Sequence, residues 1–293
     1  MKLREDGQSL HDRTHESGYR IFREPVKIET NEKFMTTIIA VSNQKGGVAK
    51  TTTCASLGAA LVELGHEVLA IDLDPQANLS LALGVNPANL RRTAADILLG
   101  NHSPLSVSRE TSLPGLDLIP SSQHMHMVEK FLHVRDNYEQ ALRQALASLT
   151  AYDVILCDCP PMLGSITLNA LTAAELLVIP TQCEYFSAYG LNEMLELVHS
   201  LRERVNPRLS YRILITLLDR RNRIHKDILE QVKGAFGDAV LETTIEIDTK
   251  LRESAVFGQP ITGYAPNSRA AQQYRALAQE LMQYARQKTA PSA

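Results

Sequence analysis

The stretch that decides the fold runs from Thr36 to Thr52 and reads Thr-Thr-Ile-Ile-Ala-Val-Ser-Asn-Gln-Lys-Gly-Gly-Val-Ala-Lys-Thr-Thr. Residues 36–42 are rich in β-branched side chains, which predicts a buried strand. A glycine-containing turn follows, and residues 51–64 read as a helix that ends before Gly65. This order predicts a phosphate-binding loop, because the N–H groups of the turn and the positive end of the helix dipole attract an anion.

The predicted loop also carries the side chains that a nucleoside triphosphate needs. Lys50 would reach the β- and γ-phosphates, and the Thr51 hydroxyl would ligate Mg²⁺. Ala49 stands where a glycine usually precedes the lysine of this motif, and its small methyl group predicts a tightened geometry with the site retained. The residues expected to surround the nucleotide are Lys45, Gly46, Gly47, Val48, Ala49, Lys50, Thr51 and Thr52.

Strands and helices alternate along the rest of the sequence. Further candidate strands are residues 67–73, 116–119, 153–157, 176–180, 212–217 and 239–245, with helical stretches that include 128–149, 188–204 and 268–287. The alternation predicts an α/β fold, a doubly wound and mostly parallel sheet with helices on both faces. We expect residues 1–34, which are crowded with charges and show no sustained period, to be a flexible N-terminal extension, and residues 35–293 to be a single domain.

Acidic residues stand at the ends of two predicted strands. Asp72 and Asp74 close the second strand, and their i, i+2 spacing points both carboxylates to one side. Asp158 follows strand 153–157, which is the Walker B arrangement that holds Mg²⁺ directly or through water. Open α/β sheets build their sites at the carboxyl ends of strands, so we expect these carboxylates beside the phosphate-binding loop.

The run from Lys45 to Thr51, Lys-Gly-Gly-Val-Ala-Lys-Thr, resembles the deviant Walker A motif of the ParA/MinD group of P-loop ATPases. The segments 71–76 and 152–161 follow it in the order of ParA-type partition ATPases. The resemblance covers residues 36–287 and implies the family fold, a doubly wound sheet that dimerises around two ATP molecules. Later segments that also resemble the family are 179–186, 258–264 and 270–278.

The resemblance implies roles for individual residues. Lys45 matches the signature lysine of the family, which crosses a dimer interface and places a cation where charge develops on the partner's γ-phosphoryl group. Asp74 would position or activate the attacking water, and Asp72 would support Mg²⁺ and the switch region. Catalytic roles are therefore expected for Lys45, Lys50 and Asp74, and metal-binding roles for Thr51, Asp72 and Asp158.

Positive charge gathers in the last third of the sequence. Residues 201–293 carry 15 Lys and Arg against 10 Asp and Glu, a balance of +5, whereas residues 1–200 have a balance of −8. ParA-type proteins bind DNA without sequence preference as ATP dimers, and clustered cations suffice for such binding. The resemblance thus implies a DNA-binding set of Arg220, Arg221, Arg223, Lys250 and Arg252, with solvated surface charge as the alternative interpretation.

The sequence indicates neither a membrane protein nor a metal site of another kind. No window approaches the ~18 apolar residues of a spanning helix, and no apolar run near the N-terminus precedes a cleavage site, so we expect a cytoplasmic protein without a membrane partner. The resemblance to DNA-binding ParA-type proteins also implies association with the nucleoid. Four cysteines are too few for a disulfide framework in 293 residues. Cys157 and Cys159 lie on a predicted buried strand, which favours packing over metal binding. His124, His126 and His133 are expected at the surface.

The motifs predict a Mg²⁺-dependent ATPase, and the resemblance implies slow basal turnover and an ATP-bound homodimer that binds nonspecific duplex DNA. A ParB-like centromere-binding partner would stimulate hydrolysis and release the DNA, so that a plasmid or chromosome origin region is segregated. One alternative is an ATPase of the same kind that positions a protein cargo, such as a chemoreceptor array or microcompartment, through a cargo adaptor. Another is a nucleotide-gated DNA-binding regulator, although residues 1–34 are too few for a separate DNA-binding domain.

Overall fold

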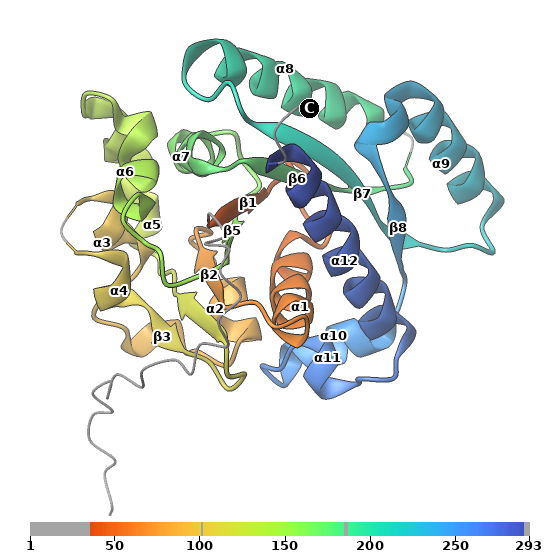
Figure 1. Ribbon diagram of the computed structural model, residues 1–293, viewed down its shortest axis with the longest axis horizontal. Helices are drawn as coiled ribbons and strands as arrows, with labels where there is room; N and C mark the ends of the chain where they lie inside the picture. The colour runs from red at the N-terminus through yellow and green to blue at the C-terminus, as the bar shows by residue number, and fades with distance from the viewer. Residues whose placement is uncertain (1–35, 101, 185–186, 290–293) are drawn as a thin grey trace, which may run out of the picture. The chain divides into compact units, whose positions relative to one another are not determined.

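The computed structural model describes residues 36–100, 102–184 and 187–289, so the predicted extension at residues 1–34 lies outside the described part. Within it, eight strands form one sheet in the order β3-β4-β2-β5-β1-β6-β7-β8 (Figure 1). The strands are β1 (Thr37–Val41), β2 (Val68–Asp72), β3 (Arg109–Glu110), β4 (Leu116–Ile119), β5 (Val154–Asp158), β6 (Leu176–Gln182), β7 (Ser210–Leu218) and β8 (Val240–Glu246). Every neighbouring pair is parallel except β3 and β4, which confirms the predicted doubly wound, mostly parallel sheet.

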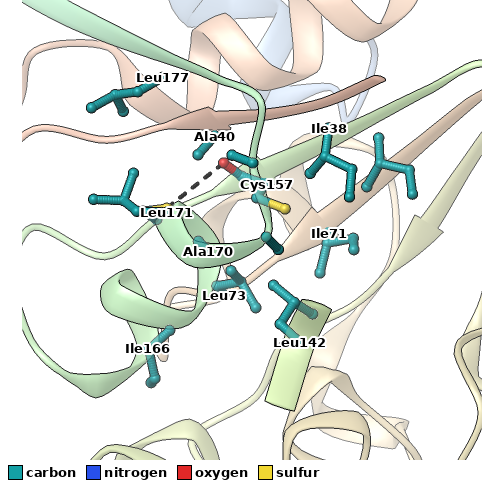
Figure 2. Close-up of a cluster of buried hydrophobic side chains, with 14 of the residues drawn as sticks. Ile38, Ala40, Ile71, Leu73, Leu142, Cys157, Ile166, Ala170, Leu171 and Leu177 are labelled. Atoms are coloured by element: carbon teal, nitrogen blue, oxygen red, sulfur yellow. Dashed lines mark hydrogen bonds between the residues drawn. The ribbon is translucent and has the colours of Figure 1, made fainter. Parts of the chain in front are cut away.

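Helices cover both faces of this sheet because successive side chains of a strand point to opposite faces. In β1, Ile38 and Ala40 join the core beneath helices α3 to α9, whereas Ile39 and Val41 join the core beneath α1, α2 and α10 to α12. The helices are α1 (Lys50–Glu63), α2 (Asn78–Ala82), α3 (Ala94–Leu98), α4 (Pro104–Val107), α5 (Met125–Phe131), α6 (Ala141–Leu146), α7 (Ser165–Ala173), α8 (Ser187–Arg204), α9 (Arg223–Phe236), α10 (Thr249–Val256), α11 (Ile261–Tyr264) and α12 (Arg269–Thr289). Figure 2 shows part of the first core, where Cys157 of β5 lies among aliphatic side chains such as Ile71.

Each predicted strand is present and ends within two residues of its predicted bounds. The strand that was not predicted, β3, has only two residues, and both are exposed at the edge of the sheet. Such a short exposed strand carries no pattern of alternating hydrophobicity, so its sequence does not separate it from a loop.

The predicted long helix at residues 128–149 is wrong, because the chain breaks it into shorter pieces. Helix α5 ends at Phe131, and after a 3₁₀ turn at Leu132–Val134 the backbone becomes extended at Arg135. Asn137 then adopts a left-handed conformation with φ 54°, which Asn tolerates better than most residues. The chain becomes α-helical again at Ala141, where α6 begins.

Helix α12 packs against α1, although the two helices lie more than 200 residues apart in sequence. Tyr274, Leu277 and Leu281 are fully buried, and the hydroxyl of Tyr274 lies 3.3 Å from that of Thr53 on α1. The helix predicted at residues 268–287 is therefore present as α12, with one apolar face buried. Among the helices of the described residues, none combines the length and apolarity that crossing a lipid bilayer demands.

Candidate functional site

The predicted phosphate-binding loop follows β1, which lies between β5 and β6 in the sheet. The loop turns sharply before α1 begins at Lys50, and both Gly47 and Ala49 have positive φ angles of 76° and 67°. A glycine adopts this conformation without steric cost, whereas in an alanine the methyl group crowds the backbone and makes the conformation unfavourable. Ala49 occupies the N-cap of α1 and makes no side-chain hydrogen bond there. The loop therefore keeps its turn at Ala49 at the expense of backbone strain.

Lys50 is buried at the first position of α1, with its amine directed back across the loop. Its Nζ donates a hydrogen bond to the carbonyl oxygen of Lys45 over 2.9 Å. Burial lowers the pKa of the Lys50 ammonium, and the nearby Asp158 carboxylate opposes this shift. The amine thus lies inside the turn where the sequence predicts the phosphates.

Thr51 and Asp158 form the centre of the predicted metal site. The hydroxyl of Thr51 donates to Asp158 Oδ2 over 2.7 Å and joins the first turn of α1 to the end of β5. The second carboxylate oxygen, Oδ1, is buried and has no hydrogen-bond partner among the described residues. A hydroxyl and a carboxylate are oxygen donors of the kind Mg²⁺ prefers, and it binds through one or two such groups while water and phosphate complete its shell. The residues present therefore fit a magnesium ion.

Electrostatics at Asp158 also favour a cation. Asp72 and Asp158 are register partners on β2 and β5, so two fully buried carboxylates lie side by side. Burial, and to a lesser degree the neighbouring carboxylate, raise the pKa of Asp158 well above its ordinary value. A divalent cation would offset both costs, because it favours the ionised form.

Asp72 holds the loop that follows β2. Its Oδ2 accepts hydrogen bonds from the backbone N–H and the hydroxyl of Ser80, at 2.8 and 2.7 Å, and its Oδ1 accepts from the Asp74 N–H. The observed contacts of Asp72 thus fix the start of α2, and its role toward Mg²⁺ stays a prediction. Asp74 is nearly buried, and one of its carboxylate oxygens, Oδ1, accepts from the Gln76 N–H over 2.9 Å.

Three polar side chains that sequence reasoning did not assign hold the phosphate-binding loop in place. Asn43 accepts from the Lys45 N–H through Oδ1 and donates through Nδ2 to the carbonyl of Pro180 on β6. Gln182, at the end of β6, and its register partner Thr216 on β7 donate to carbonyl oxygens of the loop at 2.9 and 3.0 Å. Gln182 lies in segment 179–186, which resembles the family, so the sequence held a signal for it.

Lys45 is directed toward the segment after β6. Its ammonium forms an ion pair with Glu184, and Gln182 Oε1 lies 3.5 Å from the same nitrogen. Both members of the ion pair are partly exposed, with 38% and 54% of their side-chain surface accessible. The contact of Lys45 with the phosphates in another subunit stays a prediction.

The five predicted DNA-binding residues lie beside the carboxyl ends of neighbouring strands. Leu218 of β7 and Glu246 of β8 are register partners, and the basic segments 220–223 and 250–252 follow these strands. Three of the five cations have carboxylate partners, namely Arg220 with Glu246, Arg221 with Asp219 and Lys250 with Glu253. Arg223 and Arg252 are exposed and have no ion pair within the described residues.

Arg220 has a structural role that the sequence did not reveal. Glu246 is nearly buried and accepts hydrogen bonds from Arg220 Nε at 2.7 Å and from Gln273 at 3.1 Å. Arg269, the first residue of α12, forms an ion pair with the same carboxylate at 2.8 Å. Glu246 therefore connects the loop after β7 with the start of α12.

The remaining candidate ligands lie where packing and solvation explain them. Cys157 and Cys159 are buried, and burial raises the pKa of both thiols. His124, His126 and His133 are exposed, as predicted. Across residues 36–100, 102–184 and 187–289, no cluster of three or more His, Cys, Asp or Glu side chains is arranged to hold a metal ion.

Known proteins resemble this chain over most of its length. Residues 36–211 match the AAA domain family. The chain is 37% identical to the chromosome partitioning protein ParA of Caulobacter vibrioides over 260 residues, which are 87% of this chain and 97% of that protein. It is 39% identical to the sporulation initiation inhibitor protein Soj of Bacillus subtilis over 246 residues, 83% of this chain and 97% of Soj.

A solved structure shares the fold at similar identity. Cobyrinic acid a,c-diamide synthase from Mycobacterium smegmatis, with bound ADP and magnesium, has a TM-score of 0.77 and 37% sequence identity, and the match covers 87% of this chain and 97% of that one. The matched family and the identity to ParA and Soj agree with the phosphate-binding loop and with the carboxylates at the ends of β2 and β5. The chain belongs to the ParA/MinD family of P-loop ATPases.

Proposed function

We propose that this chain is a partition ATPase that uses ATP to segregate a plasmid or a chromosome origin region. The observation that carries the proposal is the pair of Thr51 and Asp158, which joins the P-loop helix to a buried carboxylate with one unpartnered oxygen. This pair of oxygen-bearing side chains occurs in a chain that is 37% identical to a chromosome partitioning protein.

The residues of the site divide the work of hydrolysis. Lys50 and the backbone N–H groups of the loop would bind the β- and γ-phosphates, and Thr51 and Asp158 would hold Mg²⁺. The bound metal ion would neutralise charge on the phosphate oxygens. Asp74 would orient the attacking water, because its nearly buried carboxylate lies on β2's carboxyl edge and its Oδ2 has no hydrogen-bond partner among the described residues.

ATP would also set the state of assembly. Two subunits would close around two nucleotides, with Lys45 of each reaching the phosphates of its partner. Closure would combine two basic surfaces, so that nonspecific DNA binds to the dimer more tightly than to the monomer. A ParB-like partner would complete the site and stimulate hydrolysis, after which the dimer opens and the DNA is released.

Diamide synthesis, the activity in the name of the M. smegmatis protein, is not part of this proposal. A cysteine nucleophile for such chemistry requires an accessible thiol of lowered pKa. The four cysteines of this chain are buried, and burial raises the pKa of each.

The test compares nucleotide states with two unrelated DNA duplexes. Light scattering and fluorescence anisotropy are measured with ADP, with ATP and with a non-hydrolysable ATP analogue. We expect a dimer and sequence-independent DNA binding with the analogue, and neither with ADP. ATP hydrolysis without ATP-dependent DNA binding would contradict DNA partition and favour the positioning of a protein cargo. Binding to a single sequence would favour a regulator.

A further inference from the structure

The chain that leaves β6 contacts the P-loop through two side chains, Gln182 and Glu184. The backbone bends between them at Cys183, and the Glu184 N–H donates to the Gln182 carbonyl oxygen over 2.9 Å. Gln182 Nε2 donates to the carbonyl oxygen of Gly47 over 2.9 Å, and the Glu184 carboxylate forms an ion pair with Lys45. This segment thus holds the backbone of the P-loop and also the side chain of Lys45, which is proposed to reach the partner subunit.

We infer that Glu184 is a positioning residue that holds Lys45 in its own subunit until the dimer forms. The inference rests on the proposed function, in which Lys45 reaches the partner's phosphates. The ammonium of Lys45 cannot remain against Glu184 and also reach across an interface. Each subunit must therefore give up this contact, which we name the Lys45–Glu184 latch, when the dimer closes.

The backbone around Lys45 does not need to move for this exchange. The Lys45 N–H donates to Asn43 Oδ1 over 2.9 Å, and the Lys45 carbonyl accepts from Lys50 over 2.9 Å. These bonds fix the peptide groups on both sides of the Lys45 side chain. Rotation about side-chain bonds is enough to swing the ammonium away from Glu184, so the latch can open without disturbing the P-loop.

The exposure of the pair makes the latch weak and reversible. An exposed ion pair stabilises a structure only modestly, by about two- to fivefold in an equilibrium constant, and salt screens it. Because a closing dimer opens two latches, we expect them to raise the dimer dissociation constant by about four- to 25-fold. A weak latch of this size would set the protein concentration at which ATP produces dimers.

The experiment compares Glu184→Gln with a control, Glu242→Gln, in the full chain. Glutamine keeps the length of the side chain and removes its charge. Glu242 is also an exposed carboxylate in an ion pair with a lysine, Lys233, and it lies on the edge strand β8, three strands away from β1. Sedimentation with a non-hydrolysable ATP analogue gives the dimer dissociation constant, and the thermal unfolding midpoint confirms that each variant is folded.

The expected result is a four- to 25-fold lower dissociation constant for Glu184→Gln at low salt, with the difference shrinking as salt rises. Glu242→Gln should match the wild type. In a Lys45→Ala background, Glu184→Gln should have no further effect, because the latch acts only through Lys45. A dissociation constant for Glu184→Gln equal to or above the wild-type value would overturn the latch, as would an equal gain in the Lys45→Ala background.

Lys45→Ala alone separates a failure of the latch from a failure of the proposed function. If this variant dimerises and hydrolyses ATP like the wild type, the role of Lys45 across the interface is wrong, and the latch fails with it. If Lys45→Ala weakens dimerisation while Glu184→Gln leaves it unchanged, the proposed function stands and only the latch is wrong.

Discussion

Ser80 donates both its backbone N–H and its hydroxyl to one carboxylate oxygen of Asp72, at 2.8 and 2.7 Å. These bonds fasten the start of α2 to the end of β2, yet Asp72 is completely buried and beside a second buried carboxylate, Asp158. Burial raises the pKa of Asp72 to about 7, although the bonds from Ser80 act in the opposite direction. The folded protein therefore holds a proton that the unfolded chain releases near pH 4.

The raised pKa of Asp72 predicts a pH-dependent stability in the absence of nucleotide. As the pH rises from about 4 to about 7, the unfolded chain ionises first, so the free energy of unfolding falls. Asp72→Asn removes this contribution. The free energy of unfolding of the variant, relative to that of the wild type, should therefore rise by a few kcal/mol from pH 5 to pH 8, at about 1.4 kcal/mol per pH unit while only the unfolded chain is ionised. Urea unfolding at both pH values measures the difference. A constant difference would show that Asp72 does not titrate in this range.

Ala49 should be a site where glycine stabilises the protein. Its φ of 67° is left-handed, and relieving the strain of one such residue is worth about 1 kcal/mol. Ala49→Gly should raise the unfolding midpoint by about 2–4 °C. Ala276→Gly, an exposed position inside α12, is the control and should lower the midpoint by a similar amount. The same sign for both substitutions would contradict the strain.

Arg220 and Arg252 should separate structural from DNA-binding roles. Arg220→Ala removes a hydrogen bond to the nearly buried Glu246 and should lower the free energy of unfolding by about 1 kcal/mol. Arg252→Ala should change stability by less than about 0.5 kcal/mol. If it contacts phosphate, it should weaken binding to unrelated duplexes equally and reduce the salt slope by about 1 per subunit. Anisotropy titrations at several salt concentrations test this, and an unchanged slope would remove Arg252 from the DNA-binding set.

Glu129 should anchor the loop that follows Asp158. It lies on α5, and its two carboxylate oxygens accept from the N–H groups of Ser165 and Ile166, the first residues of α7, at 2.7 and 3.0 Å. Glu129→Gln leaves one acceptor in place and should destabilise the protein by about 1–3 kcal/mol. Glu139→Gln, which removes a partly exposed ion pair with Arg204, should cost less than about 1 kcal/mol. If both substitutions lowered the free energy of unfolding equally in denaturant titrations, Glu129 would not be an important cap for the start of α7.

Most of the sheet could be predicted because its strands are buried on both faces and read as continuous apolar runs. The prediction of a helix at residues 128–149 is wrong because its pattern of apolar residues continues through Asn137. The left-handed backbone conformation of Asn137 interrupts the helix, and a pattern of apolar residues does not reveal it. Lys50, Thr51 and Asp158 could be expected close together because Lys50 and Thr51 begin the helix after one strand and Asp158 ends another strand of the same parallel sheet. Gln182 and Thr216 were missed because they act through contacts with the P-loop that only the parallel pairing of β6 and β7 creates.

The predicted DNA-binding residues illustrate a second limit. Composition identified positive charge after residue 200, but charge alone does not reveal which cations already have a carboxylate partner. Arg220 is bound to Glu246, and that contact depends on the register of β8 with β7 and on the position of α12. A sequence offers no measure of such pairing, so it assigned Arg220 and Arg252 the same role.

The packing of α12 on α1 has a consequence for how this protein is made. The face of the P-loop helix that receives Tyr274 emerges from the ribosome more than 200 residues before Tyr274 does, and it stays uncovered until α12 has been synthesised. A nascent chain can form several parallel strands earlier, but its nucleotide pocket lacks the helix that supports it from behind. ATP binding is therefore expected to begin only after α12 has been released, so nascent chains that lack this helix should not yet hold the nucleotide.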